Sequence, residues 1–415
     1  IKRLKLLIAN SIINNRISEI TKKKGTVITG GGSYAQDFLD FAKFASIYVT
    51  CEPKNWEGAL SVAEQEIRRV LNYGFNESEF NEVSANFLNA YEQANRSSSS
   101  RKSRSLADSL TRSISMKKVF SSPEQDLNWI TKNISSLDKE SCHDELKSAW
   151  NSEDRQIFIG GNIELTKADN KIIEVYKKSI STKIEALKDE GQSEFAYKTF
   201  GAPGKVVERV KDDSIGVTQI RFDNNVRLNI KKTDYSKDSI IIGARIGAGM
   251  LSMPKDKPGL AVVASAVFDA GGLNKHSSDE LRRIFAGKTV SGSFSVGDDA
   301  FVYNGATNQK DFADTMQLMT AYLTDPGYRE EAFRQFNNKI DPIYTQLSHT
   351  PMGVLQDQVD RFLKSNDYRS GFPVRSDLEK ITSNDVQSWL EPSLKKGYLG
   401  VGVVGDLDEK EIIKI

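Results

Sequence analysis

Apolar residues recur at helical spacing in three long stretches of the chain, residues 4–12, 56–71 and 312–323. Apolar side chains at every third or fourth position fall on one face of an α-helix. Each stretch therefore predicts an amphipathic helix that buries one face and leaves the other in water.

A fourth stretch, GLAVVASAVFDAGG at residues 259–272, is apolar on all sides. Pro258 stands before it and the pair Gly271-Gly272 closes it. Proline is favoured at the start of a helix and glycine just after its end. We therefore expect a buried helix whose side chains are packed as core all around.

The chain contains the same arrangement of elements twice. In each copy a short β-rich run, residues 45–49 or 300–303, precedes one of the amphipathic helices. Each of these helices is followed by a glycine and an aromatic residue, Gly74-Phe75 or Gly327-Tyr328, with an acid two residues later. The helix dipole favours acids in the first turn of a helix, so both turns are expected to lead into a new helix.

The two copies also end alike. Residues 156–165 (QIFIGGNIEL) and 400–409 (GVGVVGDLDE) are apolar runs that break at Gly161 and Gly405. Both runs are predicted to be strands. The same order of elements at similar spacing indicates an internal duplication.

The second copy has additional strands in front of it. Residues 218–234 predict a β-hairpin with Asn224-Asn225 at the turn, and residues 238–249 predict a further strand. The first copy has no such residues, because the chain begins at the helix of residues 4–13. We therefore expect the chain to be a fragment of a longer polypeptide.

Strands and long helices are mixed in each copy, which predicts an α+β fold of two homologous domains. Each domain is expected to be a mostly antiparallel or mixed sheet packed with helices. Residues 1–190 form the first domain in this interpretation, and residues 215–415 the second. Residues 191–214 between them are rich in glycine, proline and charge and are expected to be a hinge or linker. Its candidate hinge residues are Gly191, Gly201, Pro203 and Gly204.

Composition is that of a globular protein, with 38% hydrophobic and 27% charged residues and a formal net charge of +1 over 415 residues. A nearly neutral chain gives no reason to expect a nucleic acid or an anionic membrane as partner. The apolar run at residues 260–268 is about half as long as the ~20 residues that a membrane helix needs, so no membrane span is expected. Two cysteines, Cys51 and Cys142, do not make a disulfide framework.

No catalytic set of serine or cysteine with histidine and an acid can be assembled from the sequence. His276 lies three and four residues before Asp279 and Glu280, a spacing that could offer metal ligands on one helix face. Serines followed by two acids are more typical of a helix start, which is the interpretation we prefer. His143 and His349 have no candidate partners near them in the sequence.

Two further motifs favour structural roles. The run RSSSSRKSRS at residues 96–105 could contact phosphates, but in a neutral chain it is more typical of a solvated helix face or loop. The triple glycine at residues 30–32 lacks the lysine of a P-loop and the spaced glycines of a dinucleotide fold. It is expected at a hairpin turn or a strand end.

Six segments, in order along the chain, resemble the pitrilysin/insulysin family of zinc metallopeptidases. They are LLIANSIINNRISEI, CEPKNWEGALSVAEQEIRRVLNYGFNESEF, IFIGGNIEL, FDNNVRLNIKKTDYSKDSIIIGARIGAG, PGLAVVASAVFDAGG and TDPGYREEAF. The resemblance implies repeated α+β domains in two halves that close like a clamshell around a peptide. Single-chain members have four such domains, with a linker between the second and third. This chain would correspond to domains two and three.

In the active first domain of the family, the helix equivalent to residues 260–268 carries an inverted zinc motif, His-x-x-Glu-His, and a later helix adds a glutamate ligand. Aligned on residues 259–261, the motif positions fall on Val262, Ser265 and Ala266, which cannot replace those residues. The later helix, residues 329–340, has no glutamate at the expected place, and Asp341 is the nearest acid. The resemblance therefore predicts no catalytic and no metal-binding residue in this chain.

The resemblance implies that the chain is the non-catalytic middle section of a zinc-dependent metalloendopeptidase that hydrolyses peptides in a closed chamber. Zinc would lie in an upstream domain absent from this chain, and the fragment alone is expected to be inactive and to bind no zinc. Its expected partners are peptide substrates and the missing first and fourth domains of the same polypeptide. Bacterial four-domain relatives suggest a periplasmic or otherwise extracytoplasmic location, which the sequence itself does not fix.

Two alternatives stay open. The parent could be a catalytically silent homologue that acts as a scaffold or a peptide-binding subunit. The reading frame upstream of Ile1 discriminates, because only an active parent encodes His-x-x-Glu-His there. The third interpretation is a binding protein that uses the basic run at residues 96–104.

Overall fold

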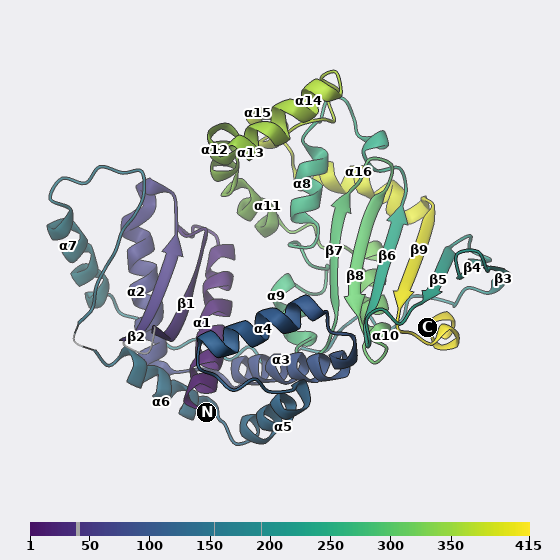
Figure 1. Ribbon diagram of the computed structural model, residues 1–415. Coiled ribbons are helices and arrows are strands. Elements are labelled where there is room, and N and C mark those ends of the chain that lie inside the picture. Colours follow the sequence, from purple (N-terminus) through teal and green to yellow (C-terminus); the bar gives the residue numbers. More distant parts are fainter. Residues whose placement is uncertain (39–41, 153, 192) are drawn as a thin grey trace. The chain divides into compact units, whose positions relative to one another are not determined.

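The computed structural model describes residues 1–38, 42–152, 154–191 and 193–415 (Figure 1). The chain forms two compact units. The first unit comprises residues 1–88 and 128–192, and the second comprises residues 89–127 and 193–415. Residues 89–127 belong to the first copy in sequence, yet their contacts group them with the second unit. Residue 192 of the predicted linker lies outside the described residues.

A long helix lies against a two-stranded sheet in the first unit. Helix α1 (Lys2–Lys22) packs on strand β1 (Gly30–Phe38), which pairs antiparallel with β2 (Ala42–Thr50). Polar contacts fix the helix on the strand, since the N–H and the hydroxyl of Ser33 donate to Asn14 Oδ1 and Asn10 Oδ1. The unit also contains η1 (Pro53–Asn55), α2 (Trp56–Tyr73), the start of α3 (Glu77–Arg96), the end of α5 (Pro123–Ile134), α6 (Lys139–Trp150) and α7 (Ala168–Ser181).

Seven strands form one mixed sheet in the second unit, in the order β3-β4-β5-β9-β6-β8-β7. Their bounds are β3 (Val206–Asp212), β4 (Val217–Phe222), β5 (Arg227–Lys232), β6 (Ile240–Ile246), β7 (Ser291–Val296), β8 (Phe301–Thr307) and β9 (Leu399–Gly405). Strand β9 lies between β5, to which it is parallel, and β6, to which it is antiparallel. The other neighbouring pairs are antiparallel.

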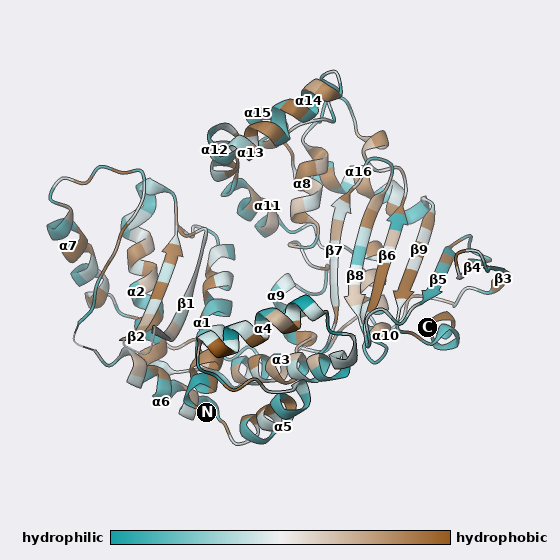
Figure 2. Ribbon diagram, in the orientation of Figure 1, coloured by the Kyte–Doolittle hydropathy of each residue, from teal (hydrophilic) through white to brown (hydrophobic). Residues whose placement is uncertain are grey.

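Helices cover one face of this sheet. Alternate residues of β6, such as Ile240 and Ile242, are buried, whereas Ile241 between them is exposed. The core on the buried face is closed by α8 (Leu260–Val267), α10 (Phe312–Thr324) and α16 (Ser383–Lys396). Figure 2 shows hydrophobic residues concentrated on these helices and on the central strands.

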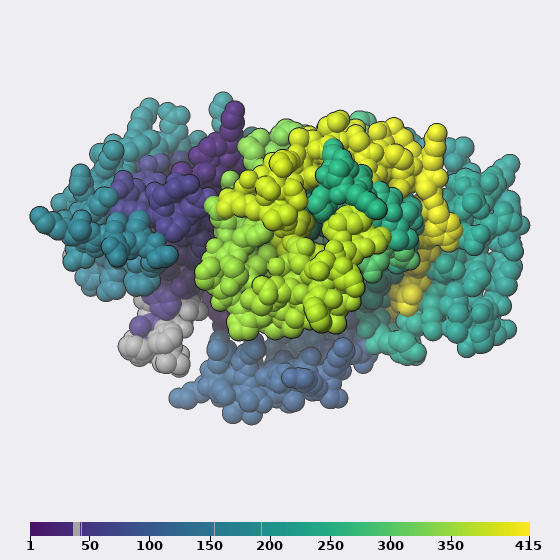
Figure 3. Space-filling view, turned by 90° about the horizontal axis from the view of Figure 1, so that it is seen from above, coloured from purple at the N-terminus to yellow at the C-terminus, as the bar shows by residue number. Residues whose placement is uncertain are grey.

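The second unit contains further short helices beside this core. They are η2 (Ser98–Ser100), α4 (Ser103–Ser115), η3 (Gly249–Ser252), α9 (Ser278–Ile284), α11 (Glu330–Asn337), α12 (Ile340–His349), α13 (Pro351–Val354), η4 (Leu355–Val359), α14 (Asp360–Leu363), α15 (Arg375–Leu378) and α17 (Glu409–Lys414). The stretch from α12 to α15 makes up much of the surface of this unit that is seen from above (Figure 3).

The structure confirms the α+β fold class and most of the predicted elements. Helices α2 and α10 lie where the apolar spacing predicts them, and the two glycine–aromatic turns lead into α3 and α11. The hairpin of β4 and β5 turns at Asn224-Asn225, where Asn225 has a φ of 66°. The triple glycine at residues 30–32 begins strand β1.

The strand predicted at residues 156–165 is wrong. This segment has no regular secondary structure, and the side chain of Phe158 is 94% exposed. Its counterpart β9 is held by hydrogen bonds to β5 and β6, and the described part of the first unit contains no counterpart of these two strands. An apolar run forms a strand only where a neighbouring strand satisfies its N–H and C=O groups.

The expectation that α8 is packed as core on all sides is also wrong. Its buried residues are Leu260, Val263, Ala264 and Val267. Val262 and Ser265 are half-buried, and Ala266 is exposed. A helix that lies beside a sheet buries only the face that meets the sheet and its neighbours, whatever the composition of the other face.

Candidate functional site

The three positions equivalent to the zinc motif lie on the less buried face of α8. Val262 and Ala266 have hydrocarbon side chains without an atom that could bind a metal ion. The hydroxyl of Ser265 donates to the carbonyl of Ala261 at 2.8 Å and accepts the N–H of Val296 at 3.1 Å. Ser265 therefore fastens the helix to the end of strand β7, and its hydroxyl is committed to this structural role.

The residues around this face do not fit a zinc ion. Asp341, the acid nearest to the expected third ligand, forms an ion pair with Arg375. Across residues 1–38, 42–152, 154–191 and 193–415, no three histidine, cysteine, aspartate or glutamate side chains are grouped so that they could hold a metal ion. That the chain binds no zinc stays a prediction for experiment.

Asp269, just after α8, is a half-buried acid with one fully buried carboxylate oxygen, and the sequence pattern does not single it out. Its Oδ2 accepts the N–H of Phe294 at 2.7 Å, while its Oδ1 is buried without a hydrogen-bond partner. Burial raises the pKa of Asp269 to about 6, although the hydrogen bond from Phe294 acts in the opposite direction. Burial raises the pKa of both Tyr303 and Tyr322, and the nearby charge of Asp269 raises each pKa further. The hydroxyl of Tyr303 is also buried without a hydrogen-bond partner.

His276 serves the packing of the chain that enters the second unit. Its Nε2 accepts the N–H of Ala196 at 2.9 Å, and its ring stacks on Phe195. The next residue, Ser277, caps α9 in a reciprocal pair with Glu280, which confirms the predicted helix start. Burial lowers the pKa of His276, so the ring is held neutral as the acceptor that Ala196 requires.

The other histidines and the cysteines lie apart from this region in the fold. His143 of α6 contacts the carbonyl of Leu71 at 3.2 Å, and His349 is exposed at the end of α12. Cys51 and Cys142 are free thiols, and burial raises the pKa of Cys142 to about 11. The structure brings none of these residues together into a catalytic arrangement.

The candidate hinge residues are all exposed. Gly191 and Gly201 have φ values of 69° and 97°, which favour glycine, and Pro203 and Gly204 follow in an exposed segment. Between the two glycines, the Tyr197 hydroxyl donates to Asp325 Oδ2 at 2.6 Å and accepts the N–H of Lys275. This part of the predicted linker is docked on the second unit, and the hinge role of the glycines stays a prediction.

The basic run at residues 96–105 is partly neutralised. Arg96 forms ion pairs with Glu92 and Asp238, and the rest of the run lies in η2, an exposed loop and the start of α4. This arrangement agrees with a solvated helix and loop. Among the helices of the described residues, none is both long and apolar enough to span a membrane.

Comparison with curated proteins finds distant relatives among processing peptidases. The chain is 19% identical to the chloroplastic stromal processing peptidase of Arabidopsis thaliana over 213 residues, which is 51% of this chain and 17% of that protein. It is 20% identical to the same enzyme of Oryza sativa subsp. indica over 244 residues, 58% of this chain and 19% of that protein. The chain thus matches less than a fifth of the length of these relatives. No protein-family model matches the chain.

Comparison with solved structures extends over nearly the whole chain. The ferredoxin protease FusC, solved in complex with Arabidopsis ferredoxin, matches with a TM-score of 0.60 and 17% identity over 99% of this chain and 46% of that chain. Pitrilysin matches with a TM-score of 0.54 and 14% identity over 100% of this chain and 44% of its own. At sequence identities this low, the two matches show a shared fold. The resemblance seen in the sequence is confirmed at that level: this chain has the fold of the pitrilysin/insulysin family of metallopeptidases.

Proposed function

We propose that the chain is the non-catalytic middle section, domains two and three, of a zinc-dependent metalloendopeptidase. The observation that carries the proposal is the match of the entire chain to less than half of each of two proteases. In this chain the zinc-equivalent helix α8 holds Val262, Ser265 and Ala266. A section with this fold and these residues contributes the wall of a peptide chamber, and the catalytic group belongs to another domain.

The missing first and fourth domains of the same polypeptide are the partners that this proposal requires. Zinc belongs to the first domain, upstream of this chain. The unpaired segment 156–165 supports the need for additional polypeptide, because its counterpart β9 forms a strand only between two neighbours. Gly191, Gly201, Pro203 and Gly204 are proposed as the hinge.

The proposed reaction is the hydrolysis of peptides that are small or unfolded enough to enter a closed chamber. A test uses the parent polypeptide with its upstream region and, beside it, the 415-residue chain alone. Short peptides and unfolded ferredoxin, the protein in the FusC complex, serve as candidate substrates. The parent should cleave at least one of them and lose this activity with a chelator, whereas the chain alone should cleave none. An inactive parent that nevertheless encodes an intact upstream zinc motif would count against the proposal.

A second function, a catalytically silent scaffold or peptide-binding subunit, is favoured by one further observation. Large apolar side chains are exposed along α13, η4 and α14, among them Met352, Phe362 at 80% and Leu363 at 73%. Exposed apolar surface of this kind commonly contacts a partner. If the upstream reading frame lacks His-x-x-Glu-His and the parent binds peptides without cleaving them, this second function replaces the first.

A further inference from the structure

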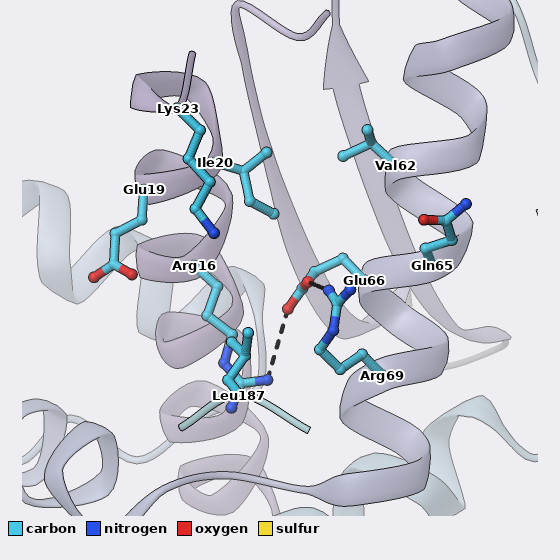
Figure 4. A pocket seen from close by; sticks show the side chains of 9 residues that line it. All are labelled: Arg16, Glu19, Ile20, Lys23, Val62, Gln65, Glu66, Arg69 and Leu187. Carbon is cyan, nitrogen blue, oxygen red and sulfur yellow. Dashed lines mark hydrogen bonds and ion pairs between the residues drawn. The ribbon is translucent and has the colours of Figure 1, made fainter. Parts of the chain in front are cut away.

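A small cavity lies between helices α1 and α2 in the first unit (Figure 4). Its volume is about 200 Å³, which is below the range of pockets for drug-sized ligands. Side chains from both helices line it, and Leu187 closes it at one side. A ligand of this cavity must therefore be small.

Buried charges form one wall of the cavity. Arg16 is 4% exposed and Glu66 is 1% exposed. The guanidinium of Arg16 donates to both carboxylate oxygens of Glu79 at 2.6 Å and to the carbonyl of Gly74 at 3.1 Å. These bonds fix its orientation.

One oxygen of Glu66 lacks a hydrogen bond in this network. Its Oε2 accepts from Arg69. Its Oε1 forms an ion pair with Arg16 Nη1 at 3.6 Å, which is too far for a hydrogen bond, and is buried without a hydrogen-bond partner. Figure 4 shows this carboxylate extending from α2 toward α1. A buried carboxylate oxygen without a donor is costly, so the position calls for a group with a proton to donate.

Cations outnumber acids in the lining by three to two, although one of the cations, Arg16, is also paired with Glu79. Lys23 extends its ammonium group toward the space between the helices (Figure 4), and no ion pair of Lys23 is found among the described residues. Arg16 and Arg69 add two guanidinium groups to this cation, while the acids of the lining are Glu19 and Glu66. Ile20 and Val62 form apolar walls between the charged groups. The cavity thus offers several donors for an anion and one buried acceptor for a proton.

We infer that this cavity binds a phosphate group that retains a proton, either as inorganic phosphate or as a small phosphate monoester. The P–O–H group donates to Glu66 Oε1. The charged oxygens accept from Lys23 and from the guanidinium groups of Arg16 and Arg69. Such charge-assisted hydrogen bonds are the strong ones in proteins.

The absence of a hydrogen-bond donor to Glu66 Oε1 makes the site selective among anions. Sulfate carries no proton at neutral pH, and its oxygens would face Glu66 Oε1 without a donor between them. Inorganic phosphate retains at least one P–O–H group across neutral pH. A monoester loses its last one above its second pKa, which is about 6. The pH dependence of binding therefore distinguishes the two sources of phosphate.

Calorimetric titration of the 415-residue chain tests the inference with sodium phosphate and sodium sulfate at pH 6 and equal ionic strength. Saturable phosphate binding with an affinity about tenfold or more above that for sulfate is expected, which corresponds to about 1.4 kcal/mol. Glycerol phosphate as a third probe should bind more weakly at pH 8 than at pH 6 if the site takes a monoester. Equal binding of phosphate and sulfate, or no saturable binding of either phosphate probe, would overturn the inference.

Three variants connect the selectivity to the named residues. Glu66→Gln should abolish the preference for phosphate, because the glutamine amide can donate to sulfate. Lys23→Met should weaken phosphate binding about tenfold, whereas Lys24→Met, an exposed neighbour outside the lining, should leave it unchanged. If Glu66→Gln fails to fold, the pair of lysine variants decides, and equal phosphate binding by both contradicts the assignment.

Discussion

The environment of Asp269 is set by residues that are distant from it in the sequence. It follows an apolar helix and precedes two glycines, a place where the sequence predicts the end of a helix. Strand β7 contacts its carboxylate and helix α10 its backbone carbonyl, and one carboxylate oxygen is buried without a partner. No local pattern reveals this burial, because the groups that enclose Asp269 lie about 25 to 53 residues further along the chain.

The substitution Asp269→Asn should stabilise the protein at neutral pH. With a folded-state pKa of about 6 against an ordinary value of 3.8, the folded chain holds a proton that the unfolded chain releases. Stability from this group is therefore present below about pH 4 and is lost as pH rises to about 6. Asparagine can still accept the N–H of Phe294 and carries no charge, so the variant should exceed the parent by about 2 to 3 kcal/mol at pH 7.5.

Urea denaturation of both proteins from pH 4 to 8 measures this effect. The stability difference should grow between pH 4 and 6 and stay constant above. Asp256→Asn, at an exposed aspartate, is the matched control and should change little at any pH. A difference for Asp269→Asn that does not vary with pH would show that the carboxyl titrates normally.

An amphipathic pattern predicts both that a helix forms and which of its faces is buried. A uniformly apolar stretch predicts only that a helix forms. Helices α2 and α10 lie where amphipathic spacing places them. The apolar stretch of α8 contains a helix too, but a sequence without polar positions carries no information about which face is buried. That choice is made by strand β7 and the neighbouring helices, and it leaves Ala266 exposed.

Histidines at positions 262 and 266 should create a zinc site on the outer face of α8. Residues four apart lie on the same side of a helix, and two imidazoles there can chelate one ion. The variant Val262→His with Ala266→His should bind Zn²⁺ at least about ten times more tightly than the parent chain in a competition titration. Equal zinc affinity of variant and parent would show that this face is not available to a metal ion.

The buried face of α8 supplies the matched control. Val263→His with Val267→His places two imidazoles in the core, where both valines are almost fully buried. This variant should lose about 3 kcal/mol or more of stability and gain no zinc affinity, because buried polar groups without partners are costly.

Apolar residues in the corresponding end segments of the two copies should differ in how much they contribute to stability. Val403 of β9 is fully buried between two strands, while Phe158 in the corresponding segment of the first copy is exposed. Val403→Ala should therefore cost about 2 kcal/mol in a denaturation experiment, and Phe158→Ala less than about 0.5 kcal/mol. Similar losses for both variants would indicate that residues 156–165 are packed as a strand in solution.

In the molecule as a whole, the pattern of elements along the sequence predicts the fold class and most of the elements. Whether a predicted strand forms depends on whether neighbouring strands are present to pair with it. The hairpin of β4 and β5 and the strand β9 form as expected, since the second unit contains their neighbours. Residues 156–165 have the same apolar character without those neighbours. The local sequence likewise does not indicate that residues 89–127 group with residues 193–415 in the second unit.

The candidate site was less predictable than the fold. Alignment places Val262, Ser265 and Ala266 at the positions of the zinc motif, but the hydrogen bonds that commit Ser265 to the helix and to β7 appear only in three dimensions. The sequence also does not predict that Glu66 Oε1 lacks a hydrogen-bond donor, because Glu66 lies within α2 like any other residue of a helix.

This chain has the fold of a zinc peptidase family, and we propose that it supplies neither the metal nor the catalytic residues. The zinc content and the peptide hydrolysis of the purified 415-residue chain, measured after incubation with zinc and removal of the excess, test this proposal. We predict no stoichiometric zinc and no cleavage of peptides. One tightly bound zinc per chain, together with cleavage that a chelator abolishes, would contradict this claim.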